Sequence, residues 1–142
     1  MAGQNTGLQR TYVLEDAEGK MFTGMTYGSG EGSVKAPTAD NAPFVGVITN
    51  DERLDDPLRA GGSQAGRNIT VQVGGYGSIR LAGTVEYGDK LILAADGKAK
   101  KMPAAIVTDE TYNVIGEAQK GGDADDVVPF KIEVMSVFVP KV

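Results

Sequence analysis

The chain of 142 residues contains no cysteine, no histidine and no tryptophan. Without cysteine it cannot form a disulfide, a thiolate nucleophile or a zinc site with sulfur ligands. Without histidine it lacks the commonest general base, the commonest metal ligand and the imidazole of a Ser-His-Asp triad. Catalysis would therefore have to come from Asp, Glu, Lys, Ser, Thr or Tyr. We expect no catalytic, cofactor-binding or metal-binding residue, and hence a protein that is not an enzyme and uses no cofactor.

Positive charge and long apolar runs are also scarce. Fourteen Lys and Arg against nineteen Asp and Glu give a net charge of −5, which repels phosphate backbones and argues against binding of nucleic acid. No apolar run is long enough to span a bilayer, and the first ten residues lack the apolar region of a secretory signal. We expect neither nucleic acid nor membrane as a partner, and folding in a cytoplasm.

Glycine, in contrast, is abundant, with 20 residues spread along the chain. Glycines that punctuate short β-prone runs indicate many turns and short strands. About eight such strands with almost no helix predict an all-β fold, a small barrel or sandwich with long Gly-rich loops. The strands are expected near residues 10–14, 20–23, 44–49, 69–73, 79–85, 91–93, 98–101, 113–118 and 127–139, the first two forming a small hairpin.

The clearest of these patterns is the stretch from Gly83 to Met102. Tyr87-Gly88-Asp89 is a turn signal, Leu91 to Leu93 is an apolar strand, and Asp96-Gly97 is a strong hairpin signal. No side chain in this stretch is arranged for chemistry, so it is expected to be scaffold.

Three polar segments of the chain are candidates for ligand binding. The segment Gly24–Asn41 contains glycines and serines but no helix or Lys-Ser pair follows, so an exposed loop is expected in place of a phosphate-binding one. Residues 50–68 have the pattern of an irregular surface loop. The acidic cluster at residues 121–126 lacks the ligand spacing of a calcium loop and predicts an acidic turn.

Two segments resemble each other within the chain. Phe44-Val45-Gly46-Val47 and Val114-Ile115-Gly116-Glu117-Ala118 each place a glycine after apolar residues, and each precedes an alternating strand, at residues 69–73 and 130–134. A glycine inside a strand marks a bend or a close approach of two backbones. This pattern favours a small closed barrel.

The N-terminal residues are small and polar. We expect residues 1–9 to form a flexible arm, which either stays flexible or orders on a partner, and residues 10–142 to form a single β domain.

The order of these motifs carries a resemblance. Phe44-Val45-Gly46-Val47 is followed by Val85–Leu91, Ala94–Ala99, Asn113–Ala118 and a closing valine-rich strand, and this series resembles the head-decoration, or capsid cement, proteins of tailed bacteriophages. The resemblance covers residues 43–139. It implies a compact β-barrel-like domain, usually trimeric, at three-fold or quasi-three-fold sites on the outside of the head, with an N-terminal arm that binds the major capsid protein.

The resemblance assigns two groups of surface residues. The expected capsid contacts are in the arm and the first strand, namely Gln4, Asn5, Thr6, Leu8, Gln9, Arg10 and Tyr12. The expected contacts between subunits, which equally suit a place in the core, are Phe44, Tyr76 and Phe138.

Two rival functions remain. One is a carbohydrate-binding or hydrolytic β-domain of a phage, although such sites usually use aromatic platforms and the chain has only nine Phe and Tyr. The other is a biotinyl or lipoyl carrier domain, because Val85–Leu91 is similar to its turn. That family modifies the lysine of a Met-Lys hairpin, whereas Lys101-Met102 reverses the order.

Overall fold

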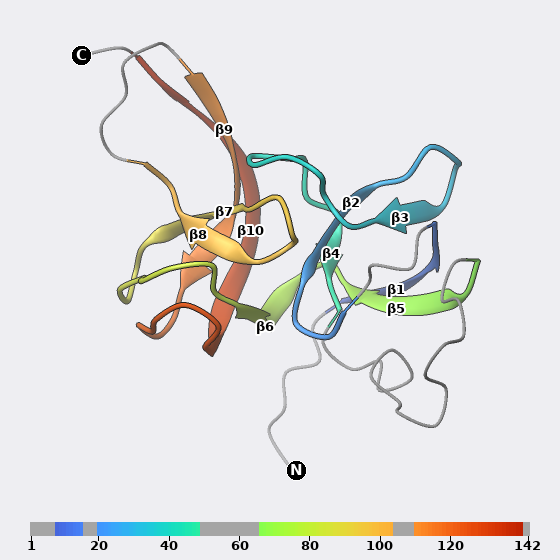
Figure 1. Cartoon of the computed structure of the whole chain (residues 1–142), viewed down its shortest axis with the longest axis horizontal. Coiled ribbons are helices and arrows are strands. Elements are labelled where there is room, and N and C mark those ends of the chain that lie inside the picture. Colours follow the sequence, from blue (N-terminus) through green and yellow to red (C-terminus); the bar gives the residue numbers. More distant parts are fainter. Residues whose placement is uncertain (1–7, 16–19, 49–65, 104–109, 141–142) are drawn as a thin grey trace.

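The computed structural model describes residues 8–15, 20–48, 66–103 and 110–140. All regular secondary structure in these ranges is β, which confirms the all-β prediction (Figure 1). The strands are β1 (Gln9–Leu14), β2 (Gly24–Tyr27), β3 (Ser33–Lys35), β4 (Gly46–Val47), β5 (Asn68–Gln72), β6 (Gly75–Arg80), β7 (Lys90–Leu93), β8 (Ala99–Lys101), β9 (Glu110–Ala118) and β10 (Val127–Val139). Within the described residue ranges no helix has the length and hydrophobicity to cross a membrane.

The first five strands form a closed barrel in the order β1-β3-β2-β4-β5. It closes because β1 pairs with β3 in parallel and with β5 in antiparallel orientation. A small barrel is filled by the side chains that point inward. Here the interior is an apolar cluster consisting of Leu14, Met25, Val34, Ala36, Val45, Ile48, Ile69 and Val71.

The second sheet has the order β6-β10-β9-β7-β8 and lies beside the barrel (Figure 1). β10 pairs with β6 over Val127–Ile132 and with β9 along most of its length. The two outer strands approach each other, because Leu81 beyond β6 forms a parallel bridge with Ala99 of β8. This sheet therefore curls around its own apolar side chains.

The predicted hairpin of residues 10–14 and 20–23 is wrong. β1 is a strand as expected, but residues 20–23 form a turn that the Thr23 hydroxyl closes by donating to the Lys20 carbonyl at 2.6 Å. Phe22 has a φ of 63°, a conformation that an extended strand excludes. The partners of β1 are instead β3 and β5.

The segment Gly24–Asn41 was predicted as an exposed loop, and this is also corrected. It contains β2 and β3, joined by a turn at residues 28–32. The carboxylate of Glu15 fastens the turn by accepting hydrogen bonds from the Ser29 N–H at 2.6 Å and the Ser29 hydroxyl at 2.8 Å, with a longer one from Ser33. These bonds, the Ser29 hydroxyl foremost, lower the pKa of Glu15.

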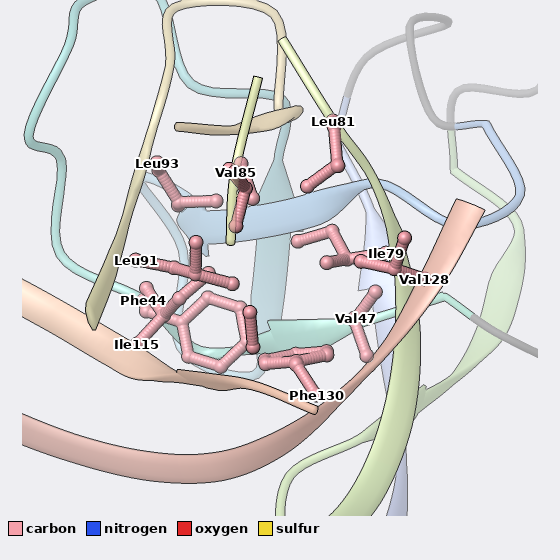
Figure 2. Close-up of a cluster of buried hydrophobic side chains, with 12 residues drawn as sticks. Phe44, Val47, Ile79, Leu81, Val85, Leu91, Leu93, Ile115, Val128 and Phe130 are labelled. Atoms are coloured by element: carbon pink, nitrogen blue, oxygen red, sulfur yellow. The ribbon is translucent and has the colours of Figure 1, made fainter. Parts of the chain in front are cut away.

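A second core lies between the barrel and the curled sheet (Figure 2). Phe44 and Val47 reach it from the barrel, while Val45 and Ile48 of the same segment point into the barrel interior. A segment buried on both sides needs apolar residues at consecutive positions. This explains the unbroken apolar run that predicted a buried strand here.

The two segments that resemble each other in the sequence each lie in an antiparallel pair. Val47 of β4 pairs with Gln72 of β5, and Gly116 of β9 pairs with Ile132 of β10. A Cβ atom on Gly46 would overlap the carbonyl oxygen of Gln72, and one on Gly116 would overlap that of Lys131. The predicted close approach of backbones is therefore confirmed at both glycines.

The stretch 83–102 forms the expected hairpin of β7 and β8. Gly97 has a φ of 88° in its turn, where glycine carries no steric cost. The Gly97 carbonyl accepts a hydrogen bond of 2.7 Å from the Gly24 N–H of β2. The hairpin thus connects the second sheet to the barrel.

Candidate interaction surfaces

The described part of the expected capsid contact begins at Leu8 and belongs to the barrel. Leu8 is 64% exposed, and its carbonyl accepts a hydrogen bond of 2.8 Å from the Val73 N–H. Gln9, the last residue of the expected arm, already pairs with Gln72 of β5. The guanidinium of Arg10 lies over the ring of Tyr12, 5.7 Å from its centroid, in the range of a cation–π contact.

The remaining residues of that prediction, Gln4, Asn5 and Thr6, lie outside the described residues. Leu8, Arg10 and Tyr12 have even numbers and lie on one side of β1, so the structure brings these three expected contacts together. Tyr12 is half-buried against the barrel interior, and Arg10 is exposed.

The three residues expected as subunit contacts lie at separate places in the fold. Phe44 is only 5% exposed and belongs to the core between the two sheets. Its ring meets that of Phe130 edge to face, with centroids 6.4 Å apart (Figure 2). Of the two roles that the sequence left open, the structure of the single chain gives Phe44 the core role.

Tyr76 of β6 and Phe138 of β10 are on the surface, 51% and 60% exposed, but they lie far apart. Tyr76 pairs with Lys131 of β10, seven positions before Phe138. At about 3.3 Å per strand residue, this separation is roughly 23 Å. Tyr76 and Phe138 therefore belong to two separate exposed regions.

Phe138 instead belongs to a projecting two-stranded segment, which we call the distal ribbon. It consists of residues 110–114 of β9 and residues 134–139 of β10, and it extends beyond the rest of the second sheet (Figure 1). A register shift between Ile132 and Met135 marks its base, as expected where a bulge turns a strand. β6 pairs with β10 only as far as Ile132, so in the described part of the chain the far side of β10 has no partner strand beyond that point.

Both faces of the distal ribbon carry apolar residues, and Glu110, which pairs with Val139, adds a charge to one of them. We call the side of Val134, Ser136 and Phe138 its front face. Val134 is 58% exposed and Phe138 is 60% exposed. We call the opposite side its back face, where half-buried Met135, Val137 and Val139 pack with Tyr112 and Val114.

Sequence reasoning singled out Phe138 but missed the rest of the ribbon. The signal was present, because no charged residue stands between Val134 and Pro140 or between Thr111 and Gly116. A strand with apolar residues at consecutive positions is one that is covered on both faces.

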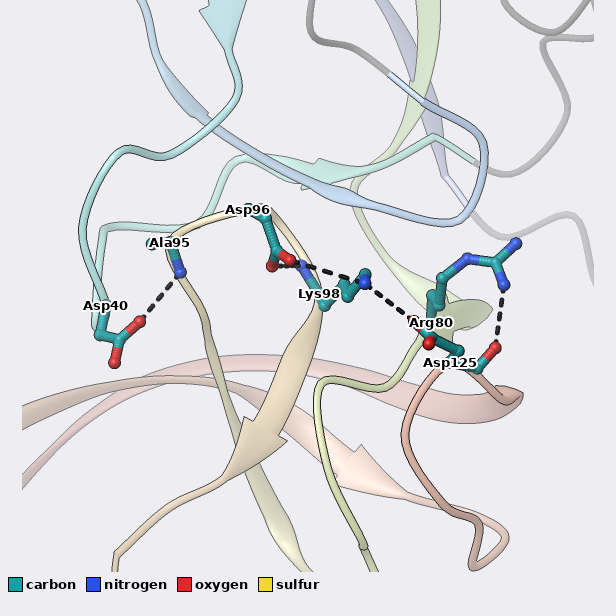
Figure 3. A network of polar contacts seen from close by, with 6 residues as sticks. All are labelled: Asp40, Arg80, Ala95, Asp96, Lys98 and Asp125. Carbon is teal, nitrogen blue, oxygen red and sulfur yellow. Dashed lines mark hydrogen bonds and ion pairs between the residues drawn. The ribbon is translucent and has the colours of Figure 1, made fainter.

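The groups with shifted pKa values among the described residues are held in separate polar contacts. Lys98 donates to the Asp125 carboxylate at 2.8 Å, and Arg80 donates to the Asp125 carbonyl at 2.9 Å (Figure 3). The hydrogen bond from Lys98 lowers the pKa of Asp125, and the same bond raises the pKa of Lys98. The predicted acidic turn is thus tied to β6 and to the β7–β8 hairpin.

Asp40 makes a similar contact on another side of that hairpin. Its carboxylate accepts hydrogen bonds from Lys100 and, at 2.9 Å, from the Ala95 N–H (Figure 3 shows the latter). The Lys100 bond is the main cause of the lowered pKa of Asp40.

Burial raises the pKa of Tyr112. In the described ranges no three acidic side chains gather in a way that could hold a metal ion. The hydrogen bonds of Asp40 and Asp125 join segments that are distant in the sequence.

Comparison with known proteins gives a match in structure alone. No protein-family model matches the sequence, and no curated protein matches it. The chain is similar to the N base of head fiber gp8.5 of bacteriophage phi29, with a TM-score of 0.60 and 15% sequence identity. The two chains share a fold. The alignment covers 89% of this chain and 93% of that chain, so the likeness includes both the barrel and the second sheet.

Proposed function

We propose that this chain is a structural protein of a tailed-bacteriophage head, and that it has no enzymatic activity. The observation that carries the proposal is the fold shared with the head fiber base of phi29 over nearly the whole chain. A fold hosts many functions, so this likeness supports the proposal only together with the independent resemblance of the sequence motifs to head-decoration proteins. These two lines of support rest on different properties. The shared fold depends on the pairing of strands, and the resemblance depends on the order of sequence motifs.

In this proposal the chain is a capsid decoration, or cement, protein. It is made in the cytoplasm of the host bacterium and binds the outer surface of the assembled head through the major capsid protein, at three-fold or quasi-three-fold sites, as a homotrimer. Anything that binds the assembled shell and not the free subunit stabilises the shell by mass action. A trimer that touches several capsid subunits adds avidity.

The capsid contact is proposed to include residues 4–12. Leu8, just before β1, and Arg10 on β1 are both exposed, and a bound capsid segment there would bury the leucine and pair with the cation. The arm ahead of them can add backbone hydrogen bonds to a sheet edge of the capsid protein. Because β1 itself is held by β5, contacts from Leu8 and Arg10 start from a fixed strand.

The test is binding to heads of the phage whose genome encodes the chain. Purified protein is mixed with expanded and with unexpanded heads, and bound protein is measured after sedimentation. We expect saturable binding to expanded heads and a higher temperature of head disruption when the protein is bound. Absence of binding to both kinds of head would overturn the proposal.

The contact residues are tested with a matched pair of variants. Leu8→Ser is expected to weaken head binding roughly tenfold, the effect of about 1.4 kcal/mol. Tyr87→Ser, which removes an exposed aromatic ring from a turn elsewhere, should leave binding unchanged. Deletion of residues 1–7, which spares the Leu8–Val73 hydrogen bond and the Gln9–Gln72 pair, should also weaken binding. Equal binding by Leu8→Ser, the deletion and wild type would place the contact elsewhere.

A further inference from the structure

The first five strands and the last five repeat one pairing scheme. The order around the barrel is β1-β3-β2-β4-β5. The second sheet, followed from β6 in the other direction, has the order β6-β8-β7-β9-β10, because the bridge between Leu81 and Ala99 joins the end of β6 to β8. In each half the first strand is parallel to the third, and the other neighbouring strands are antiparallel. The chain therefore contains the same five-stranded arrangement twice.

Backbone hydrogen bonds between distant residues recur at matching places in the two halves. In the first half the N–H groups of Leu14, Gly66, Phe22 and Ile48 donate to the carbonyls of Arg67, Leu14, Ile48 and Thr23, and in the second half those of Leu81, Asp125, Gly88 and Ala118 donate to the carbonyls of Asp126, Leu81, Ala118 and Asp89. These bonds match Leu14 with Leu81, and hence align β1 with β6 and β5 with β10 residue by residue.

The alignment identifies one end of each barrel. It matches Leu8, Arg10 and Tyr12 in the first half with Gly75, Gly77 and Ile79 in the second. Arg10 pairs with Val71 of β5, and Gly77 pairs with Phe130 of β10. Val71 and Phe130 are both core residues, so the two matched positions adjoin the interior of their barrels. We call the end of the first barrel at Leu8, Arg10, Tyr12 and Val73 its mouth.

In the second half the matching end is filled by an apolar segment of the first half. Cγ1 of Val47 lies 3.2 Å from the place that a Cβ atom on Gly77 would take. Phe44, from the same segment, packs edge to face on Phe130 (Figure 2). A barrel of this kind therefore accepts an apolar segment at this end, and the chain itself contains the example.

The mouth of the first barrel receives no such segment from the described residues. Leu8 is 64% exposed and Arg10 is exposed, whereas side chains that merely filled the place of an inserted segment would be buried. Tyr12 and Val73 are half-buried on the barrel core. The mouth is thus an accessible apolar surface at a place where the other half of the chain has a covered one.

Arg10 determines the chemistry of the occupant. Its guanidinium lies over the Tyr12 ring and forms no ion pair with a carboxylate in the part of the chain that the structure describes. A segment that covered the mouth would take this cation out of water, which is strongly unfavourable unless an anion pairs with it. The occupant must therefore combine apolar side chains with a carboxylate.

We propose that the mouth binds an extended segment of the major capsid protein that carries apolar side chains, spaced like Phe44 and Val47, and an acidic residue that pairs with Arg10. This inference rests on the proposed function and names the kind of capsid segment that the protein recognises. Leu8, Tyr12 and Val73 supply the apolar contact.

The first test measures the binding of charge variants to expanded heads. Arg10→Glu should weaken binding roughly tenfold or more, because it opposes two carboxylates in the contact. Arg10→Lys keeps the charge and should lose less. Lys120→Glu is the matched control, since Lys120 is an exposed cation outside the mouth, and the same change of charge there should leave binding unchanged. Equal midpoints in urea will show that the variants are folded.

A cross-linking experiment identifies the occupant. Because the natural chain has no cysteine, Leu8→Cys and Lys120→Cys can each carry a single benzophenone group. After binding to expanded heads and illumination, mass spectrometry should find the capsid protein joined to position 8 and not to position 120, at a segment with apolar residues and an acidic one. Heads in which that acidic residue is replaced by lysine should bind Arg10→Glu better than they bind wild type.

The outcomes separate this inference from the proposed function. Heads that bind wild type and Arg10→Glu equally would overturn the inference and leave the proposed function standing. A cross-link from position 8 to a segment without an acidic residue would have the same meaning. Heads that bind no wild-type protein would overturn the proposed function and this inference with it.

Discussion

Asn41, in the segment between β3 and β4, and Asn113 of β9 are joined by two hydrogen bonds. The Asn113 N–H donates to Oδ1 of Asn41 at 2.7 Å, and Nδ2 of Asn113 donates to the Asn41 carbonyl at 2.8 Å. Nδ2 of Asn41 also donates to the Thr111 carbonyl at 2.9 Å. Strand β7 pairs with β9 only as far as Val114, so Asn41 bonds the backbone of β9 where β7 has ended. It fixes the base of the distal ribbon to the segment between β3 and β4.

Replacing Asn41 by alanine should lower the free energy of unfolding by about 2–5 kcal/mol. Asn41 has a φ of 66°, where alanine costs about 1–2 kcal/mol, and the unpartnered groups of β9 cost about 1–3 kcal/mol more. Asn41→Gly is the control, because glycine accepts this φ and loses only the side-chain bonds. Urea unfolding should therefore rank wild type above Gly and Gly above Ala; an alanine variant as stable as wild type would refute the role of this residue.

Gly116 should not tolerate any side chain. A Cβ atom there would collide with the backbone of Lys131 on the paired strand, and neither strand can move without breaking the ladder. We expect Gly116→Ala to cost at least about 3 kcal/mol, at the upper end of overpacking effects. Gly83→Ala is the matched control, since an added Cβ at Gly83 meets nothing within 4 Å. Similar midpoints for the two variants in urea would contradict this account.

The sequence predicted those elements whose pattern is local. Alternation of apolar and polar residues located β5, and the bounds of β10 were predicted to the residue. The turn signals located the β7–β8 hairpin. The apolar run at residues 44–49 predicted a buried strand. Residues 44–48 are buried between the two cores, although only Gly46–Val47 form strand β4.

The sequence could not predict pairings between distant strands. Tyr12 pairs with Ile69, and no local pattern marks that choice, so β1 was assigned to a neighbour in the sequence. β2 and β3 were missed because they are short and flank a Gly/Ser turn, and only Met25 and Val34 carry their apolar signal. Phe44 shows a further limit of prediction from sequence. A buried core residue and a subunit contact are both apolar, and only the fold distinguishes one role from the other.

Phe44→Ala tests this separation. Removing a buried phenylalanine costs about 3–5 kcal/mol, and because Phe44 packs on Phe130 within the same chain, the loss should not depend on protein concentration. Phe138→Ala is the contrasting variant. At a concentration where the chain is monomeric, its unfolding midpoint should equal that of wild type. Thermal unfolding across a hundredfold dilution series checks both, and a concentration-dependent loss in Phe44→Ala would return this residue to the interface.

Acid should weaken the fold through three carboxylates that hold turns in place, those of Glu15, Asp40 and Asp125. Their folded-state pKa values lie below the ordinary values of 4.5 for glutamate and 3.8 for aspartate, because Ser29, Lys100 and Lys98 respectively donate hydrogen bonds to them. A group with a lowered folded pKa contributes stability that is complete above its ordinary pKa and disappears as pH falls through the folded value. Melting temperature should therefore be constant from neutral pH to about pH 5 and fall below pH 4.

Glu15→Gln isolates one of these contributions. The neutral amide loses the charge that the Ser29 N–H and hydroxyl stabilise, so the variant should melt below wild type at pH 7. The difference should disappear as pH falls through the folded pKa of Glu15, because the wild-type carboxyl is then neutral as well. Glu31→Gln is the control, since Glu31 is exposed in the same turn and forms no hydrogen bond or ion pair to the described residues. A Glu15→Gln difference that persists unchanged at pH 3 would show that shape, not charge, fastens the β2–β3 turn.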